Sequence, residues 1–265
     1  MKVFISADME GLATTSIHED CNPIHPQYLY HCEEMTKEVV AACEGAIAAG
    51  ADEILIKDAH GPASNIDPKA LPECCKIIRK WSGHPYQMVE GIDGSFDAAL
   101  FVGDHNAASR NGNPLSHTTS GRPHTVKING RLASQFLIFS YAAALEGVPT
   151  VYISGDKQLC EDYADLHPKL VSTSVKEGDG SSVCLTAPKR AIAMIKEDVE
   201  KALSQDLADA LIKLPDSFHV EICYNHHSEA RKHSFYPGAV QISDDTITFD
   251  HTDYFEVLRF LKFCL

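Results

Sequence analysis

The residues best suited to chemistry follow three short apolar runs of the chain, and they are carboxylates and imidazoles. After the first run stand Asp8 and Glu10, whose two-residue spacing turns both carboxylates to one side of an extended chain. Two carboxylates so close repel each other unless a cation lies between them. The same spacing after the second run pairs Asp58 with His60, and the third run ends in His105.

These side chains meet if the three runs are neighbouring strands of a parallel sheet. The carboxyl ends of such strands share one edge, where open α/β proteins bind their ligands. Two carboxylates and two imidazoles suit Zn²⁺ or a similar metal, and a bridging Asp can hold two ions about 3.5–4 Å apart, which would activate water. The predicted metal ligands are Asp8, Glu10, His60 and His105. Any one of them alone is better explained as a loop or helix cap, so the prediction depends on the set.

The elements that must position this site are expected from short apolar runs that alternate with helix-forming segments, a pattern typical of a parallel α/β sheet. Strands are expected at residues 3–5, 53–57, 98–102 and 150–154, and helices at 28–49, 133–145, 159–165 and 189–203. A strand at 218–224 and a helix at 254–263 follow. We therefore predict an α/β metal-site domain over residues 1–187, with a largely parallel sheet flanked by helices. A smaller α+β domain is expected over residues 188–265.

Composition restricts the class of protein and its partners. The 265 residues are 44% hydrophobic and 23% charged, as in globular proteins. Acidic residues outnumber basic ones by 37 to 23, so we expect neither nucleic-acid nor membrane partners. No targeting signal or membrane-spanning apolar stretch is visible, which favours a cytoplasmic location. Nine cysteines without a Cys-x-x-Cys pair indicate reduced, packed thiols rather than disulfides or a thiolate zinc site.

One further histidine, His117, follows a loop rich in Gly and Asn that could fold back over the metal site. Its imidazole could donate to the oxyanion of a tetrahedral intermediate or carry a proton to a leaving amine. From the spacing alone, an ordinary loop histidine is the simpler interpretation. The single tryptophan, Trp81, is expected to serve packing.

Five motifs in this order and spacing carry a family resemblance. They are Asp-Met-Glu-Gly from residue 8, Lys-Asp-Ala-His-Gly from 57, Met-Val-Glu-Gly from 88, Phe-Val-Gly-Asp-His from 101 and Leu-Ser-His-Thr from 115. With them the chain resembles the DppA-type D-aminopeptidases, a family of zinc peptidases, over at least residues 1–190. The resemblance implies an aminopeptidase that cleaves short peptides with an N-terminal D-amino acid.

The resemblance also implies roles for individual residues. Asp8 would bridge two zinc ions, with Glu10 and His105 on one ion and His60 on the other. His117 would be the catalytic residue, assisting the attack of metal-activated water on the amide carbonyl. The family further implies a self-compartmentalised homo-oligomer, expected to be a decameric ring, that acts on a small peptide or amide substrate.

The chain departs from the family at one implied metal ligand. Gln135 stands where the resemblance places a Glu, and a carboxamide lacks the negative charge that strengthens a metal site. Its oxygen could still coordinate, and Asp104 beside His105 could supply the missing charge. Two alternatives stay open: a mononuclear metal amidase of different specificity, and a non-catalytic oligomer that binds a peptide or a metal.

Overall fold

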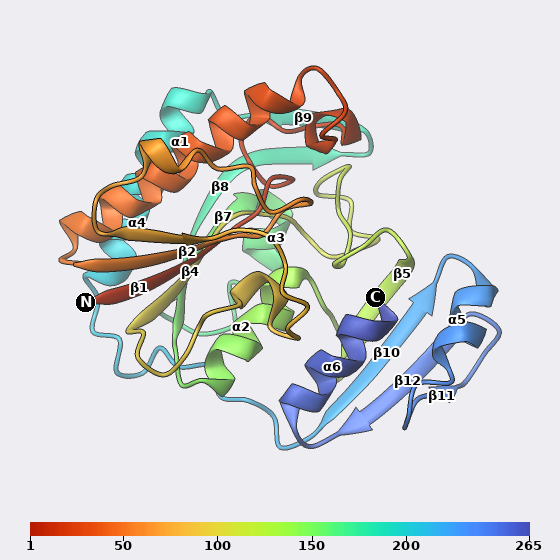
Figure 1. Ribbon diagram of the computed structural model, residues 1–265. Coiled ribbons are helices and arrows are strands. Elements are labelled where there is room, and N and C mark those ends of the chain that lie inside the picture. Colours follow the sequence, from red (N-terminus) through yellow and green to blue (C-terminus); the bar gives the residue numbers. More distant parts are fainter.

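Two β-sheets organise the computed structural model, which describes residues 1–265 (Figure 1). The first sheet has the strand order β3-β2-β1-β4-β7-β8-β9. Its strands are β1 (Lys2–Ala7), β2 (Glu53–Asp58), β3 (Cys75–Ile78), β4 (Ala98–Asp104), β7 (Thr150–Asp156), β8 (Val171–Asp179) and β9 (Ser182–Leu185). All neighbours pair in parallel except β9, which runs antiparallel to β8. The predicted fold class, α/β with a largely parallel sheet, is confirmed.

The second sheet is antiparallel and has the strand order β11-β12-β10-β5-β6. Its strands are β5 (Pro123–Ile128), β6 (Arg131–Leu132), β10 (Phe218–Tyr224), β11 (Val240–Gln241) and β12 (Thr246–His251). Strands β5 and β6 thus come from within residues 1–187. The division expected at residue 188 does not coincide with the division between the sheets, because mid-chain strands complete the C-terminal sheet.

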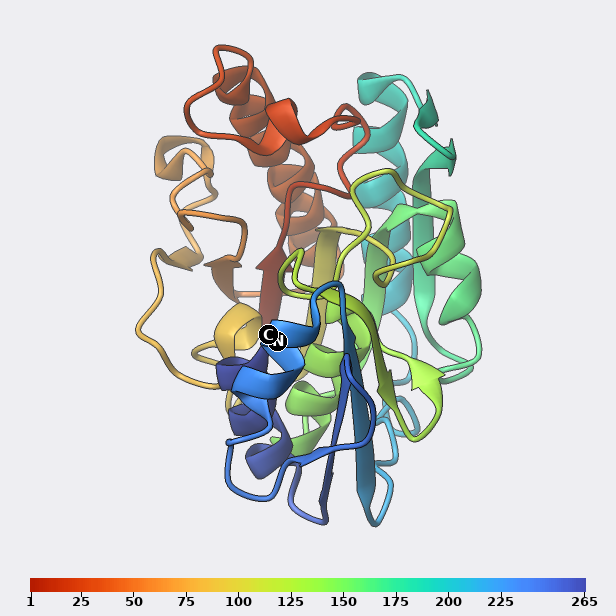
Figure 2. The same cartoon turned by 90° about the vertical axis from the view of Figure 1, so that its right-hand side faces the viewer.

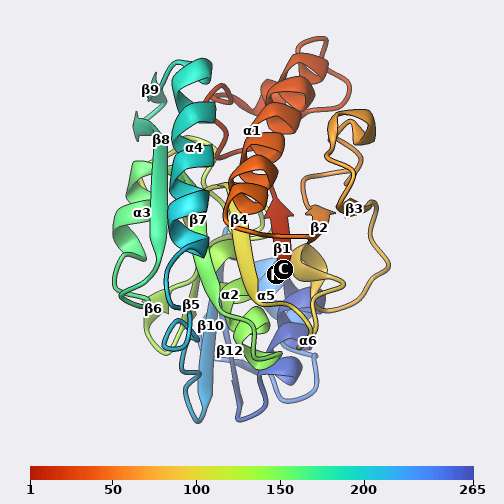
Figure 3. The same cartoon turned by 90° about the vertical axis from the view of Figure 1, so that its left-hand side faces the viewer.

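Helices cover both faces of the first sheet and also pack on the second sheet. They are α1 (Tyr28–Ala48), α2 (Gln135–Leu145), α3 (Lys157–Asp162), α4 (Pro188–Leu203), α5 (His227–His233) and α6 (Tyr254–Cys264), with short 3-10 helices η1 (His18–Cys21), η2 (Pro68–Ala70) and η3 (Gln87–Val89). Figure 3 shows α1 and α4 side by side across one face. Their close approach requires Gly45, where a Cβ atom would lie 2.4 Å from the carbonyl oxygen of Lys196.

Burial on both faces explains the continuous apolar runs of the central strands. In β1, Val3 and Ile5 belong to the hydrophobic cluster under α1 and α4, whereas Phe4 belongs to the cluster that contains α2, α6 and the second sheet. Phe101 of β4 faces the same way as Phe4 and packs edge-on against Phe136 of α2, with ring centroids 5.2 Å apart. The first sheet is therefore the middle layer of the molecule.

The carboxyl ends of β1, β2 and β4 lie together at one edge of the first sheet. Ala7 of β1 is in register with Asp58 of β2 and with Val102 of β4, so β1 and β2 end level and β4 runs two residues further, to Asp104. In Figure 2 the loops that follow β1 and β4 lie above the second sheet. None of the helices has both the length and the apolar content that crossing a bilayer requires.

Candidate metal centre

The loop after β1 is fixed against the end of β4. The backbone N–H of Asp8 donates to the Val102 carbonyl at 2.9 Å, and that of Gly11 donates to the Gly103 carbonyl at 2.8 Å. A Cβ atom on Gly11 would lie only 1.7 Å from the Asp104 carbonyl oxygen, so the approach requires glycine. This contact brings the first carboxylate pair beside the end of the third predicted strand.

The loop after β2 is organised by Asp58, whose side chain is fully buried. Its carboxylate accepts hydrogen bonds from the backbone N–H groups of Asn65 at 2.6 Å and Ile66 at 3.0 Å, and from the Asn65 amide at 2.6 Å. The Asn65 amide also donates to the His60 carbonyl at 2.8 Å. Asp58 therefore holds the segment that carries His60.

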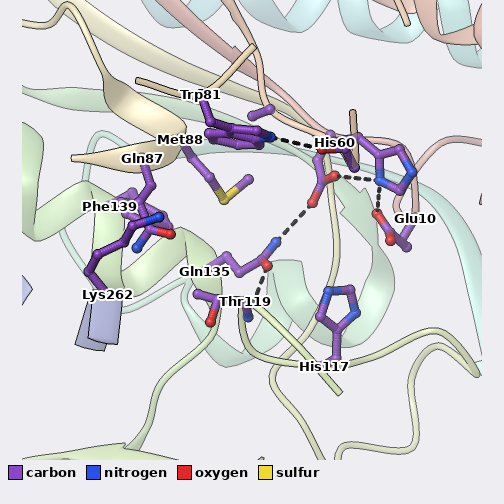
Figure 4. Close-up of a pocket in the computed structure, with 13 residues that line it drawn as sticks. Glu10, His60, Trp81, Gln87, Met88, His117, Thr119, Gln135, Phe139 and Lys262 are labelled. Atoms are coloured by element: carbon purple, nitrogen blue, oxygen red, sulfur yellow. Dashed lines mark hydrogen bonds and ion pairs between the residues drawn. The ribbon is translucent and has the colours of Figure 1, made fainter. Parts of the chain in front are cut away.

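The four predicted ligands converge at the edge of the sheet, and Figure 4 shows two of them, Glu10 and His60, facing each other. Asp8 lies between the two histidines: its Oδ1 is 3.3 Å from His60 Nδ1, and its Oδ2 is 3.6 Å from His105 Nε2. Glu10 Oε2 is 2.9 Å from the same His60 nitrogen. All four side chains are buried. Asp8 thus has one oxygen toward each imidazole, the arrangement that a bridging carboxylate needs.

Backbone carbonyls orient the two imidazoles. His60 Nε2 donates to the Cys21 carbonyl at 3.1 Å, and His105 Nδ1 donates to the Asn106 carbonyl at 3.0 Å. These bonds leave Nδ1 of His60 and Nε2 of His105 facing the carboxylates. Such second hydrogen bonds fix the tautomer and the ring orientation of metal-binding histidines.

The electrostatics of the cluster favour a cation. Burial and the neighbouring Glu10 raise the pKa of Asp8 to about 6. Burial also works against the charged form of Glu10, but the facing imidazoles, chiefly His60, outweigh it and hold the Glu10 pKa well below its usual range. The pKa of His60 is likewise raised well above its ordinary value, because Glu10 and Asp8 outweigh its burial. In the metal-free protein a proton on His60 therefore partly neutralises the carboxylates, and a metal ion would displace it.

His105 differs from His60 in its protonation. Burial and the adjacent His117 lower the pKa of His105 to about 3. Its imidazole is therefore neutral, and Nε2 carries a lone pair toward Asp8. A neutral imidazole nitrogen that faces a carboxylate is the form that binds transition metals.

His117 reaches the site on the loop that follows β4, as the sequence predicts. Its Nδ1 donates to the Leu115 carbonyl at 2.9 Å, and its ring stacks on His105 with centroids 4.3 Å apart. The half-buried imidazole lines a cavity of about 450 Å³ together with Asp8, Glu10 and His60. His117 Nε2 is therefore available to a molecule bound in that cavity.

Gln135 is the first residue of α2, whose N-cap is Ser134. Its Oε1 accepts a hydrogen bond from the Thr119 backbone N–H at 3.0 Å. Its Nε2 donates to Asp8 Oδ2 at 2.9 Å and lies 3.2 Å from His105 Nε2. The amide nitrogen, and not the oxygen, thus faces the predicted ligands, so in this orientation Gln135 is a hydrogen-bond donor.

Asp104 is buried and lies outside both groups of side chains whose ligand atoms gather closely enough for a metal. Its Oδ1 accepts from the His105 backbone N–H at 2.8 Å, and its Oδ2 has no hydrogen-bond partner. Burial and the neighbouring Asp8 raise its pKa well above the usual range. Without a metal ion the neutral form of Asp104 is therefore favoured, and its carboxyl group lies apart from both groups of ligand atoms.

Several residues of the site were not predicted as such. Lys176 of β8 is fully buried, and its ammonium donates to the backbone carbonyls of Glu10 and Thr15. Burial lowers the Lys176 pKa to about 8. Trp81, expected in packing, lines the cavity and donates from Nε1 to the Gly61 carbonyl at 2.8 Å. Lys176 escaped prediction because no local spacing connects it with residue 10, 166 positions away.

Comparison with known proteins identifies the family of this chain. The model of the D-aminopeptidase family matches residues 1–263. The chain belongs to the D-aminopeptidase family. A D-aminopeptidase of Bacillus subtilis (strain 168) is 26% identical over 263 residues, which are 98% of this chain and 94% of the relative. The predicted family is thus confirmed, and the protein is an enzyme of the peptidase class.

A solved structure of the family has the same fold. It is described as the Zn-dependent D-aminopeptidase DppA from Bacillus subtilis, a self-compartmentalizing protease. The two structures superpose with a TM-score of 0.92 at 25% sequence identity, over 100% of this chain and 96% of the other. The fold that positions the metal centre is therefore shared along the whole chain.

The orientation of Gln135 predicts opposite effects of Gln135→Glu with and without metal. Without metal, the introduced carboxylate would lie beside Asp8 Oδ2 in place of the Gln135 amide that donates to this oxygen. The lost hydrogen bond and the repulsion should lower the free energy of unfolding by about 1.5–3 kcal/mol. With zinc, whose ligands include carboxylates and imidazoles, the added charge should tighten binding by roughly tenfold or more. Thermal unfolding of the chelator-treated and the zinc-loaded variant measures both effects. An unchanged zinc affinity would contradict a metal site beside Gln135.

Proposed function

We propose that this member of the D-aminopeptidase family is a zinc-dependent aminopeptidase that removes an N-terminal D-amino acid from short peptides. The observation that carries the proposal is the position of Asp8 between His60 and His105, with Glu10 beside them, at the wall of an open cavity. The zinc dependence named for the structural relative supports the choice of metal. D-stereochemistry rests on the family description.

The donor set fits zinc. Asp8, Glu10 and His105 form one group with mutually close ligand atoms, and His60 faces the other oxygen of Asp8. These residues would hold two ions, with Asp8 shared. Bound zinc would act as a Lewis acid that polarises the substrate carbonyl and lowers the pKa of water.

The protein's own residues bind the substrate and move protons. Asp8 and Glu10 line the cavity, so a peptide bound with its N-terminus at this end places its first amide carbonyl beside the metal ligands. Met88 and Phe139 supply apolar surface for side chains. His117, fixed through Nδ1, can donate from Nε2 to the developing oxyanion or pass a proton to the leaving amine.

The role of His117 predicts a separation between catalysis and metal binding. Because general acid–base groups typically contribute about 10²–10⁴-fold to the rate, His117→Ala should lower kcat by at least about 100-fold on D-alanyl dipeptides. Zinc content should be unchanged, since His117 Nδ1 is held by a backbone carbonyl and the ring lies beyond the ligand groups. Elemental analysis and steady-state kinetics test this. His124→Ala, at an exposed histidine outside the cavity, is the control, and retained activity in His117→Ala would remove His117 from catalysis.

Lys262 of α6 supports a substrate with a free carboxylate. Figure 4 shows it with Gln87 and Phe139 at the opposite end of the cavity from Glu10 and His60. No carboxylate of the protein pairs with its ammonium, although the side chain is half-buried. A peptide whose N-terminus lies at the metal ligands and whose C-terminal carboxylate lies at Lys262 would span the cavity from one end to the other.

This arrangement predicts discrimination between dipeptides and their C-terminal amides. Lys262→Met should raise KM for D-alanyl dipeptides roughly tenfold, about 1.4 kcal/mol of binding, and leave KM for the matching amides unchanged. Lys213→Met, at an exposed lysine outside the cavity, is the control. Equal effects of Lys262→Met on acid and amide would mean that the lysine does not recognise a carboxylate.

We also propose that the chain forms a homo-oligomer, with a decameric ring as the expected form. The self-compartmentalizing description of the structural relative supports it. Exposed apolar side chains near the start of α1 offer contact surface, since Ile24 is 90% and Leu29 71% exposed.

An oligomer predicts a mass well above the 29.0 kDa of one chain in light scattering coupled to size exclusion. Leu29→Glu should shift the protein toward smaller species, because a charge in an apolar interface is costly to bury. A wild-type mass of one chain at micromolar concentration would contradict the proposal.

A further inference from the structure

The side chain of Cys21 lies against the metal centre. One ligand atom each from Glu10, Cys21 and His60 lies within 4.8 Å of the other two, and this is a separate group from that of Asp8, Glu10 and His105. Glu10 is common to both groups. The cysteine therefore stands on the His60 side of the site, where Gln135 has no contact.

The segment that carries Cys21 is held in place on several sides. Cys21 ends η1, and its carbonyl accepts the hydrogen bond from His60 Nε2 at 3.1 Å. Asp20 accepts from the backbone N–H of Ser16 at 2.9 Å and pairs with His31 at 3.1 Å. Because Asp20 and His31 are both buried, the position of the thiol beside the site is fixed by the fold.

The charge of the site leaves room for a further anionic ligand. Two zinc ions carry four positive charges, whereas the gathered protein ligands supply two carboxylates, Asp8 and Glu10. Gln135 is neutral and turns its amide nitrogen inward, and Asp104 lies outside both groups. The thiol of Cys21 is the remaining side chain in these groups that can supply a negative charge.

We propose that the Cys21 thiolate is a ligand of the zinc ion on the His60 side, together with Glu10 and His60. This assignment rests on the zinc centre of the proposed function. On binding, the S–H bond breaks, a Zn–S bond forms and the proton leaves to solvent. Thiolate is among the preferred ligands of zinc, and a bound cation deprotonates it.

The metal-free state of Cys21 is consistent with this exchange. Burial and the nearby carboxylates of Glu10 and Asp8 raise the pKa of the thiol above its ordinary value, so without metal the cysteine is neutral. A bound zinc ion would add positive charge beside the sulfur, which favours the thiolate. The carboxylates that disfavour the free thiolate would then bind the same ion.

Cobalt substitution tests the ligand directly, because Co²⁺ takes zinc sites and a thiolate bound to it gives a charge-transfer band in the near ultraviolet. The full-length wild-type protein loaded with Co²⁺ should show this band. Cys21→Ser should abolish it, and Cys32→Ser should keep it. Cys32 is the matched control because it is also half-buried and free but belongs to neither ligand group.

Metal content and thiol reactivity give independent readouts. With zinc in excess, the wild type should hold two ions per chain, whereas Cys21→Ser should bind the ion on the His60 side at least tenfold more weakly. In the unmodified wild type, zinc should protect Cys21 from alkylation, read by mass spectrometry, which avoids dependence on the folding of a variant. Circular dichroism of the metal-free variants verifies that they fold.

The outcomes separate this inference from the proposed function. A cobalt-loaded protein without the thiolate band, or a band that persists in Cys21→Ser, overturns the assignment even if D-peptides are cleaved. A band lost only in Cys21→Ser supports it even if D-peptides are not cleaved, in which case the proposed substrate is wrong. A wild type that binds a single ion without protecting Cys21 overturns the assignment and favours a mononuclear enzyme.

Discussion

The buried carboxylate pair of Asp8 and Glu10 is the constraint on which the rest of the site depends. Two anions in a protein interior are costly unless charges or donors face them, and here the His60 imidazole and the amide of Gln135 face them. Lys176 holds the same loop by donating to the backbone carbonyl of Glu10 and not to its carboxylate. The ammonium group thus fixes the backbone, and the Glu10 carboxylate stays free to bind a metal ion.

The fold meets this constraint by ending three neighbouring parallel strands at one edge of the first sheet. Their apolar residues alternate between two hydrophobic clusters, so β1 and β4 are continuous apolar runs and can be located in the sequence. Once the strands are placed, the ligands follow, because Asp8, His60 and His105 stand just past the strand ends. That part of the fold and of the site could be predicted, as could α1, whose helix-forming residues run without a proline to Ala48.

The rest could not be read from local patterns, for identifiable reasons. Strand β5 pairs with β10, which follows about 90 residues later in the chain, and β6 pairs with β5. No local signal therefore assigns these two strands to the C-terminal sheet. Strand β8, which carries Lys176, is only partly buried and has no continuous apolar run, whereas β1 is buried from its second residue onward. Cys21 comes to the site through the carbonyl contact of its own backbone with His60, a pairing across 39 positions that spacing does not encode. A search for paired cysteines does not find a single cysteine that lies among carboxylate and histidine ligands.

The ligand set also bears on which metal the enzyme selects. Carboxylates and imidazoles alone admit several divalent ions, since affinity in such sites follows the general order of the transition metals. With Cys21 bound, one ion gains a soft sulfur ligand, which disfavours Mg²⁺ and Mn²⁺ and favours zinc. Gln135 weakens metal binding on the His105 side, because its carboxamide has no negative charge and turns a hydrogen-bond donor toward Asp8. The two ions proposed for this centre would therefore differ in affinity, the tighter one beside Cys21 and His60 and the more exchangeable one beside His105 and His117.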